Sequence, residues 1–328
     1  MSNVAQFPAR IQWRCRPLSG ISAVLLPFTA QGTMDEDGFR RHLERTLNAG
    51  LRVAVNMDTG YGDLLTPEEK QRVLGWTQAV LGARQDHTGR NPPCDWFVAG
   101  ALPAAFPQGA EVAYARECAA IAGAGGVPIL FPTAASAALD DAGLIRLFTT
   151  VGKACERFLA FELGPVFNPH GRLFSKSVLR ALLEIPQCRG LKHSSLDRGT
   201  EQERLALRDA LRPEFTIYTG NDLAADMVEY GSDYLLGLST FHPELFAARD
   251  RAFAAGEPRY RELRDLVQYL GWLGFRPPVP AYKHAAAMFL KLGGHIACDD
   301  PHPRAPRREA WDRAALADAA ARIARLVG

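Results

Sequence analysis

A lysine stands directly after a short apolar run and before a histidine and two serines. Lys192 follows Gly190 and Leu191, so it lies at the end of a predicted strand. A lysine withdrawn from water at such a position has a lowered pKa, because burial disfavours the ammonium form. A neutral amine is what attack on a ketone or aldehyde requires. The residues alone leave a second interpretation open, a structural lysine paired with a carboxylate such as Glu162.

Other polar side chains also follow predicted strands. Glu162 ends the strand that precedes that of Lys192. A carboxyl group in a half-buried site has a raised pKa and can transfer protons, so we predict Glu162 as the general acid and base. A salt bridge that only fixes the lysine is the alternative. The predicted substrate-binding residues are Asp58, Thr59, Gly60, Tyr61, Asn221, Ser239, Thr240 and His242. His242 could equally cap the next helix, and Asn221 could serve a helix start first.

These residues require elements that bring them together. Eight apolar segments of strand length alternate with segments of helical periodicity, and most are continuously apolar, which is typical of a parallel sheet covered by helices. A capping box at Thr66–Glu69 and a serine at position 175 predict two helix starts. The predicted fold is α/β, a (β/α)8 TIM barrel with a C-terminal helical extension. The predicted strands are residues 22–28, 52–57, 96–101, 127–132, 158–163, 190–193, 215–219 and 234–239.

The order of the segments predicts three regions. Residues 1–20 form an N-terminal arm, 21–256 the catalytic barrel, and 257–328 a C-terminal helical region with helices over 260–275, 282–292 and 310–327. In such barrels the active-site residues come from the carboxyl ends of the strands and the loops after them. The candidate residues named above all occupy such positions.

Composition limits the class of protein. The chain has 328 residues, 23% charged residues and a net charge of +2 without a basic block, so we expect neither nucleic acid nor a membrane as partner. No run approaches the roughly 20 apolar residues of a membrane span. Six distant cysteines without a Cys-x-x-Cys pair predict reduced thiols. We therefore expect a cytoplasmic enzyme that acts on a small molecule.

The segment around Lys192 resembles the sixth strand of the dihydrodipicolinate synthase/N-acetylneuraminate lyase superfamily, in which the lysine of a Gly-Leu-Lys stretch forms a Schiff base. Further landmarks agree in order and spacing, at residues 23–27, 35–50, 57–69, 219–222 and 278–283. The resemblance implies a class I aldolase or lyase without a cofactor, in which a Lys192 iminium supports C–C cleavage, C–C formation or dehydration of a keto acid or sugar-derived carbonyl compound. It also implies a homo-oligomer, a dimer or a tetramer.

The sequence departs from the family pattern in three places. The family's threonine pair, which binds the substrate carboxylate, is replaced by Asp58-Thr59, and Glu162 stands where the family has a tyrosine after the fifth strand. The tyrosine of the fourth strand is also absent. We therefore do not expect dihydrodipicolinate synthesis, and whether the substrate is a simple 2-keto acid stays open. His193 is predicted to point away from Lys192, and Lys283 to have a structural or interface role.

Two other functions remain open at this stage. Asp58, Glu162, His193 and His242 could together bind a divalent cation that acts as a Lewis acid, although no closely spaced histidine pair supports this and we predict no metal. The scaffold could also serve as a sugar or keto-acid sensor without catalysis. A buried amine without a role would be costly, which favours the enzyme.

Overall fold

The computed structural model describes residues 15–88, 97–103 and 106–327. Most of the predicted arm, and the first residue of the predicted third strand, lie outside these ranges. Eight parallel strands close into a barrel in sequence order, which confirms the (β/α)8 prediction. The strands are β1 (Gly20–Ala23), β2 (Arg52–Val55), β3 (Phe97–Ala101), β4 (Gly126–Leu130), β5 (Phe158–Leu163), β6 (Cys188–Ser194), β7 (Thr216–Thr219) and β8 (Asp233–Leu236).

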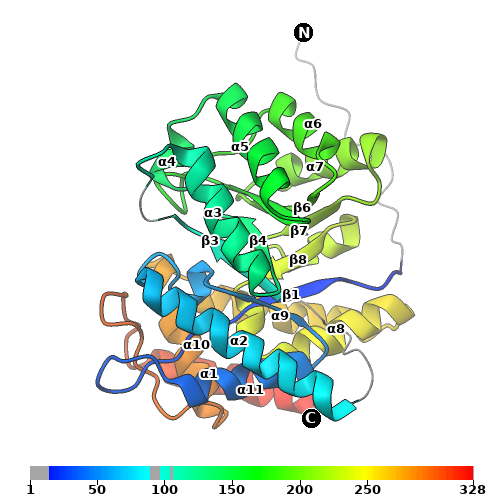
Figure 1. The fold of residues 1–328 in the computed structure, drawn as a ribbon. Coiled ribbons are helices and arrows are strands. Elements are labelled where there is room, and N and C mark those ends of the chain that lie inside the picture. The colour runs from blue at the N-terminus through cyan, green and yellow to red at the C-terminus, as the bar shows by residue number, and fades with distance from the viewer. Residues whose placement is uncertain (1–14, 89–96, 104–105, 328) are drawn as a thin grey trace.

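Helices surround the barrel, and α9 and α11 of the C-terminal region pack against α8 (Figure 1). The α-helices are α1 (Glu36–Asn48), α2 (Pro67–Thr88), α3 (Ala110–Gly123), α4 (Ala134–Ala137), α5 (Asp141–Ala154), α6 (Lys176–Glu184), α7 (Arg198–Leu211), α8 (Pro243–Ala255), α9 (Tyr260–Gly274), α10 (Tyr282–Leu292) and α11 (Asp312–Val327). Four short 3-10 helices are η1 (Asp58–Gly60), η2 (Ala225–Tyr230), η3 (Leu238–Thr240) and η4 (Val279–Ala281). The segment between β7 and β8 thus contains the 3-10 helix η2.

Local signals placed several helix starts correctly. Thr66 and Glu69 exchange reciprocal hydrogen bonds at the start of α2, as the capping box predicts. The Ser175 hydroxyl accepts from the backbone N–H of Val178 and caps α6. Strand ends were predicted less well, because β8 stops at Leu236, three residues before the predicted end. That early end changes the surroundings of the residues after it.

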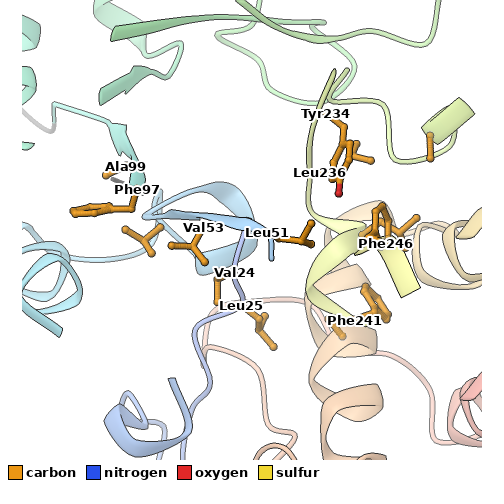
Figure 2. Packing of buried hydrophobic residues seen from close by; sticks show 14 of the residues in the cluster. Val24, Leu25, Leu51, Val53, Phe97, Ala99, Tyr234, Leu236, Phe241 and Phe246 are labelled. Carbon is orange, nitrogen blue, oxygen red and sulfur yellow. The ribbon is translucent and has the colours of Figure 1, made fainter. Parts of the chain in front are cut away.

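The buried side chains form two layers, one inside the barrel and one between strands and helices. Successive residues of a strand alternate between these layers. In β5, Leu159 and Phe161 belong to the inner layer, whereas Phe158 and Ala160 belong to the outer layer. Figure 2 shows part of the outer layer, to which β2, β3, β8, α8 and the residues directly after β1, Val24 and Leu25, contribute. The face of its strand on which a polar residue stands therefore decides whether it can reach the barrel interior.

Two other predictions concern the whole chain. In the part of the chain that the structure describes, no helix is long and apolar enough to cross a membrane. Five of the six cysteines lie there, and all five are free thiols, whereas Cys94 lies outside it. The homo-oligomer and the cytoplasmic location stay predictions.

Candidate active site

Lys192 lies on the inner face of the barrel near the carboxyl end of β6. It is paired in register with Phe161 of β5, and its Nζ is 4.4 Å from the centroid of the Phe161 ring. Only 9% of the residue is exposed. Gly220, directly after the neighbouring strand β7, leaves room for the lysine side chain, because a Cβ at position 220 would lie 2.6 Å from Lys192 Cε. The amine is thus largely withdrawn from water, as predicted.

Burial lowers the pKa of Lys192 to about 8, while the carboxylates of Asp222 and Asp58 act in the opposite direction. Burial raises the pKa of Asp222 to about 7, although this carboxyl accepts a 2.7 Å hydrogen bond from the backbone N–H of Leu238. An amine and a carboxyl group that both titrate near neutral pH are suited to exchanging protons with a substrate.

Asp58 belongs to a hydrogen-bonded group that we call the Asp58 cluster, formed by Asp58, Thr59, Tyr282 and Lys283. Asp58 accepts hydrogen bonds of 2.8 Å from the Tyr282 hydroxyl and 2.9 Å from Lys283 Nζ. The hydroxyls of Thr59 and Tyr282 are 2.9 Å apart. Burial raises the pKa of Asp58, but Lys283 and Tyr282 outweigh this and hold the pKa below its ordinary value. A carboxylate with 53% of its side chain exposed therefore stays charged beside the lysine site.

Two members of this cluster come from outside the barrel. Tyr282 and Lys283 open α10 in the C-terminal helical region. The sequence predicted a structural or interface role for Lys283 and did not single out Tyr282. The only signal was the proline-rich run that precedes them, and such a run does not say where in space the next residues lie. The structure places both against Asp58, a predicted substrate-binding residue.

Glu162, predicted as the general acid and base, is held in contacts on the helix-facing side of β5. Glu162 pairs in register with His193, so it faces the helices. It accepts hydrogen bonds of 2.6 Å from His193 Nδ1 and 2.9 Å from Arg204 Nε, and its second oxygen accepts from the Phe174 N–H. Burial raises the pKa of Glu162, but His193 and Arg204 outweigh it and the pKa is lowered. Its carboxylate is fully buried in an ion pair with Arg204, whereas the alternative interpretation was a salt bridge to Lys192.

His193 is oriented as predicted. Its ring is fully buried and lies between Glu162 and the Ser195 hydroxyl, 2.7 Å from Nε2. Asn221 also faces the helices, because its side-chain amide donates to Glu201 of α7. Neither residue is brought to the Lys192 amine.

The predicted substrate-binding residues after β8 are also held in structural contacts. The Ser239 hydroxyl donates to the backbone carbonyl of Leu236, and the Thr240 hydroxyl accepts from the N–H of Leu25. Both residues are fully buried. His242 accepts from the N–H of Leu245 and caps α8, which was one of its two predicted roles. These contacts argue against direct substrate binding by the three residues.

In the loop after β2, the side chain of Asp58 is exposed to solvent, whereas the three residues that follow it are buried. Asp58 is open to solvent, whereas Thr59 is only 2% exposed. Gly60 lies against the backbone of Val24, the residue after β1. A Cβ added at position 60 would be 3.3 Å from the carbonyl oxygen of Val24. Tyr61 is buried with a positive φ of 58°, and Lys283 Nζ lies 5.3 Å from its ring centroid. Of the four residues, Asp58 is the one with an exposed side chain.

The four residues of the metal hypothesis do not converge. Glu162 and His193 face the helices, His242 caps α8, and Asp58 pairs with Lys283. Within the described ranges, no group of three or more histidine, cysteine, aspartate or glutamate side chains could hold a metal ion. The arrangement therefore does not support the ligand set of this alternative hypothesis.

Comparisons with known proteins bear on this site. No family model matches the chain. A 4-hydroxy-tetrahydrodipicolinate synthase of Stenotrophomonas maltophilia R551-3 is 30% identical over 244 residues, 71% of this chain and 75% of that relative. A protein of Streptomyces avermitilis named probable 5-dehydro-4-deoxyglucarate dehydratase 2 is 29% identical over 269 residues, 80% of this chain and 74% of the relative. A 25% identical synthase of Kosmotoga olearia is matched over 61% of this chain and 63% of its own length.

A solved structure shares the fold. YagE of E. coli K12, described in complex with pyruvate, has a TM-score of 0.76 at 16% identity, with 94% of this chain and 98% of that chain covered. The fold and the buried lysine define a (β/α)8 barrel protein with an amine at the centre of its candidate site. Together with the sequence relatives, this shows that the chain belongs to the dihydrodipicolinate synthase/N-acetylneuraminate lyase superfamily.

Proposed function

We propose that the protein is a class I lyase that forms a Schiff base between Lys192 and a carbonyl substrate. The observation that carries the proposal is the position of the Lys192 amine, which is buried on the inner barrel face with a pKa lowered to about 8. Near neutral pH an amine with this pKa has a neutral fraction far larger than that of an exposed lysine. The names of the sequence relatives, a synthase and a dehydratase, support a lyase.

The chemistry follows from the neutral amine. Nζ attacks the carbonyl carbon to give a carbinolamine, and loss of water from it leaves an iminium ion. The iminium accepts the electron pair of the bond between the two following carbons, which allows C–C cleavage and its reversal. It also accepts the electron pair of the adjacent C–H bond as a base removes that proton, and the enamine so formed expels hydroxide from the next carbon and restores the iminium. Asp222 has a pKa of about 7 and influences the titration of Lys192. In this proposal it accepts the ammonium proton and returns it to the carbinolamine oxygen.

Borohydride reduction tests the proposal, because it converts an iminium into a stable secondary amine. We expect adducts with carbonyl compounds to map to Lys192 by peptide mass spectrometry and to disappear in Lys192→Ala. The matched control is Lys153→Ala, which removes an exposed lysine of α5 and should trap normally. An adduct formed by Lys192→Ala at the wild-type yield would show that another residue carries the chemistry.

A further inference from the structure

A serine, a histidine and a carboxylate form a hydrogen-bonded row on the helix-facing side of β6, which we call the Ser195 row. The Ser195 hydroxyl lies 2.7 Å from His193 Nε2, and His193 Nδ1 lies 2.6 Å from Glu162 Oε1. A nucleophile, its base and the group that orients the base are held at about 2.6 to 3.2 Å from one another. The Ser195 row therefore has the order and the distances of a Ser-His-Glu nucleophilic triad.

The contacts of Glu162 fix the direction of the protons in this row. Its carboxylate accepts from Arg204 Nε and from the backbone N–H of Phe174, which hold it in place. An ionised carboxylate only accepts hydrogen bonds, so His193 donates to it through Nδ1. In the neutral ring Nε2 is then an acceptor, and it faces the Ser195 hydroxyl. His193 thus has the tautomer that a general base for a serine requires.

Ser195 lies in the short turn between β6 and α7. Its hydroxyl also has 3.1 Å contacts with the backbone carbonyl and the backbone N–H of Asp197. A hydroxyl has one proton and two lone pairs, so the N–H of Asp197 occupies a lone pair, and the shorter contact directs the proton to His193. Ser195 is 4% exposed, but the next residue, Leu196, is 69% exposed. The turn that carries the hydroxyl therefore borders solvent.

We propose that the Ser195 row is a second reactive site, at which Ser195 takes the acyl group of a small activated ester and passes it to water. Oγ attacks the ester carbonyl carbon as its proton moves to His193 Nε2. The C–O bond of the ester breaks, the alcohol leaves with that proton, and an acyl-serine remains. Water then attacks the acyl carbon as His193 takes its proton, and the acid leaves as this proton returns to Oγ. Glu162 stabilises the imidazolium formed in both steps.

Diisopropyl fluorophosphate tests the nucleophile in the full chain without a variant. Attack by Ser195 forms an O–P bond and expels fluoride, while His193 takes the hydroxyl proton. We expect peptide mass spectrometry to place the label on Ser195. A chain that stays unlabelled, or that carries the label only on other residues, would overturn the proposal. This readout does not involve the Lys192 amine, so the proposed Schiff base and this inference are tested separately.

Release of p-nitrophenolate from p-nitrophenyl acetate measures the complete cycle. Attack by an amine gives an amide and stops after a single round, whereas an acyl-serine is hydrolysed and the cycle repeats. We expect Ser195→Ala to lower the multiple-turnover rate about a hundredfold. The matched control is Ser177→Ala, because Ser177 of α6 is exposed and its hydroxyl contacts Ser175 and Asp141. Equal turnover in the two variants would contradict the proposal.

His193→Gln separates catalysis from structure. A glutamine amide can donate to Glu162 and accept from Ser195, but it does not take up a proton. We therefore expect the rate of Ser195 labelling to fall about a hundredfold, with unchanged circular dichroism and urea unfolding. A folded His193→Gln protein that is labelled as fast as the wild type would refute the role of His193 as base. If either variant does not fold, the position of the wild-type label decides the question alone.

Discussion

Replacing Lys192 by methionine should remove the chemistry and make the protein more stable. The fall of the Lys192 pKa from 10.5 to about 8 means that the folded state disfavours the ammonium form by about 3 kcal/mol, at about 1.4 kcal/mol for each tenfold change in acidity. Methionine has a similar length and no charge, and it fits an apolar position beside Phe161. At pH 7 we therefore expect Lys192→Met to raise the free energy of unfolding by up to about 3 kcal/mol.

The sign of the pH dependence makes this prediction specific. Because the folded pKa lies below the unfolded one, the unfolded wild type binds more protons than the folded wild type between about pH 8 and 10.5. The destabilisation is complete below pH 8 and disappears as the pH approaches 10.5. Urea unfolding of both proteins from pH 6.5 to 10 should show the gain shrinking above pH 8, and Lys153→Met should show no gain. A stability gain of Lys192→Met that does not change with pH, or a lower free energy of unfolding of this variant at pH 7, would refute the argument that burial lowers the pKa of Lys192.

Three further predictions concern the same elements. Gly220→Ala would place a Cβ within 2.6 Å of Lys192 Cε, so borohydride trapping should fall at least about tenfold with unchanged circular dichroism. The control is Gly75→Ala in α2, where an added Cβ would have no atom within 4 Å. This variant should form the borohydride-reduced adduct at the wild-type yield. Glu162→Gln should lower the free energy of unfolding by about 3 kcal/mol or more, since it breaks a buried ion pair with Arg204, yet Lys192 should still form the adduct. A loss of trapping in a fully folded Glu162→Gln protein would restore its catalytic role. Finally, the trapping rate should rise with pH through about 8 as Lys192 loses its proton.

The sequence was sufficient for the barrel because that fold is specified by repeated local signals. Eight apolar runs, the capping box at Thr66 and the serine cap at Ser175 each act within a few residues. Lys192 and His193 were assigned to opposite faces from alternation along one strand, which needs no knowledge of the neighbouring strands. The alternation was confirmed, with Lys192 against Phe161 and His193 against Glu162.

The site was harder to predict because it depends on which strand positions pair with one another. Glu162 lies next to Phe161 in the chain, but the face that each residue occupies follows from the pairing of β5 with β6, and this pairing shifts by one residue at Phe158/Leu159. In a strand buried on both sides, apolar neighbours give no information about which face is the interior. A glutamate in such a strand can be catalytic or structural, and only the partner distinguishes them. Here the partner is Arg204 of α7, forty-two positions along the chain.

The Asp58 cluster shows a second limit of prediction from the sequence, because its members lie far apart in the chain. Tyr282 and Lys283 follow the last barrel strand by more than a full βα unit, yet they determine the charge and direction of a carboxylate near Lys192. The C-terminal helical region therefore contributes directly to the electrostatics of the site. The covered Lys283 holds the pKa of the exposed Asp58 carboxyl below its ordinary value, so two residues far along the chain keep this carboxylate charged.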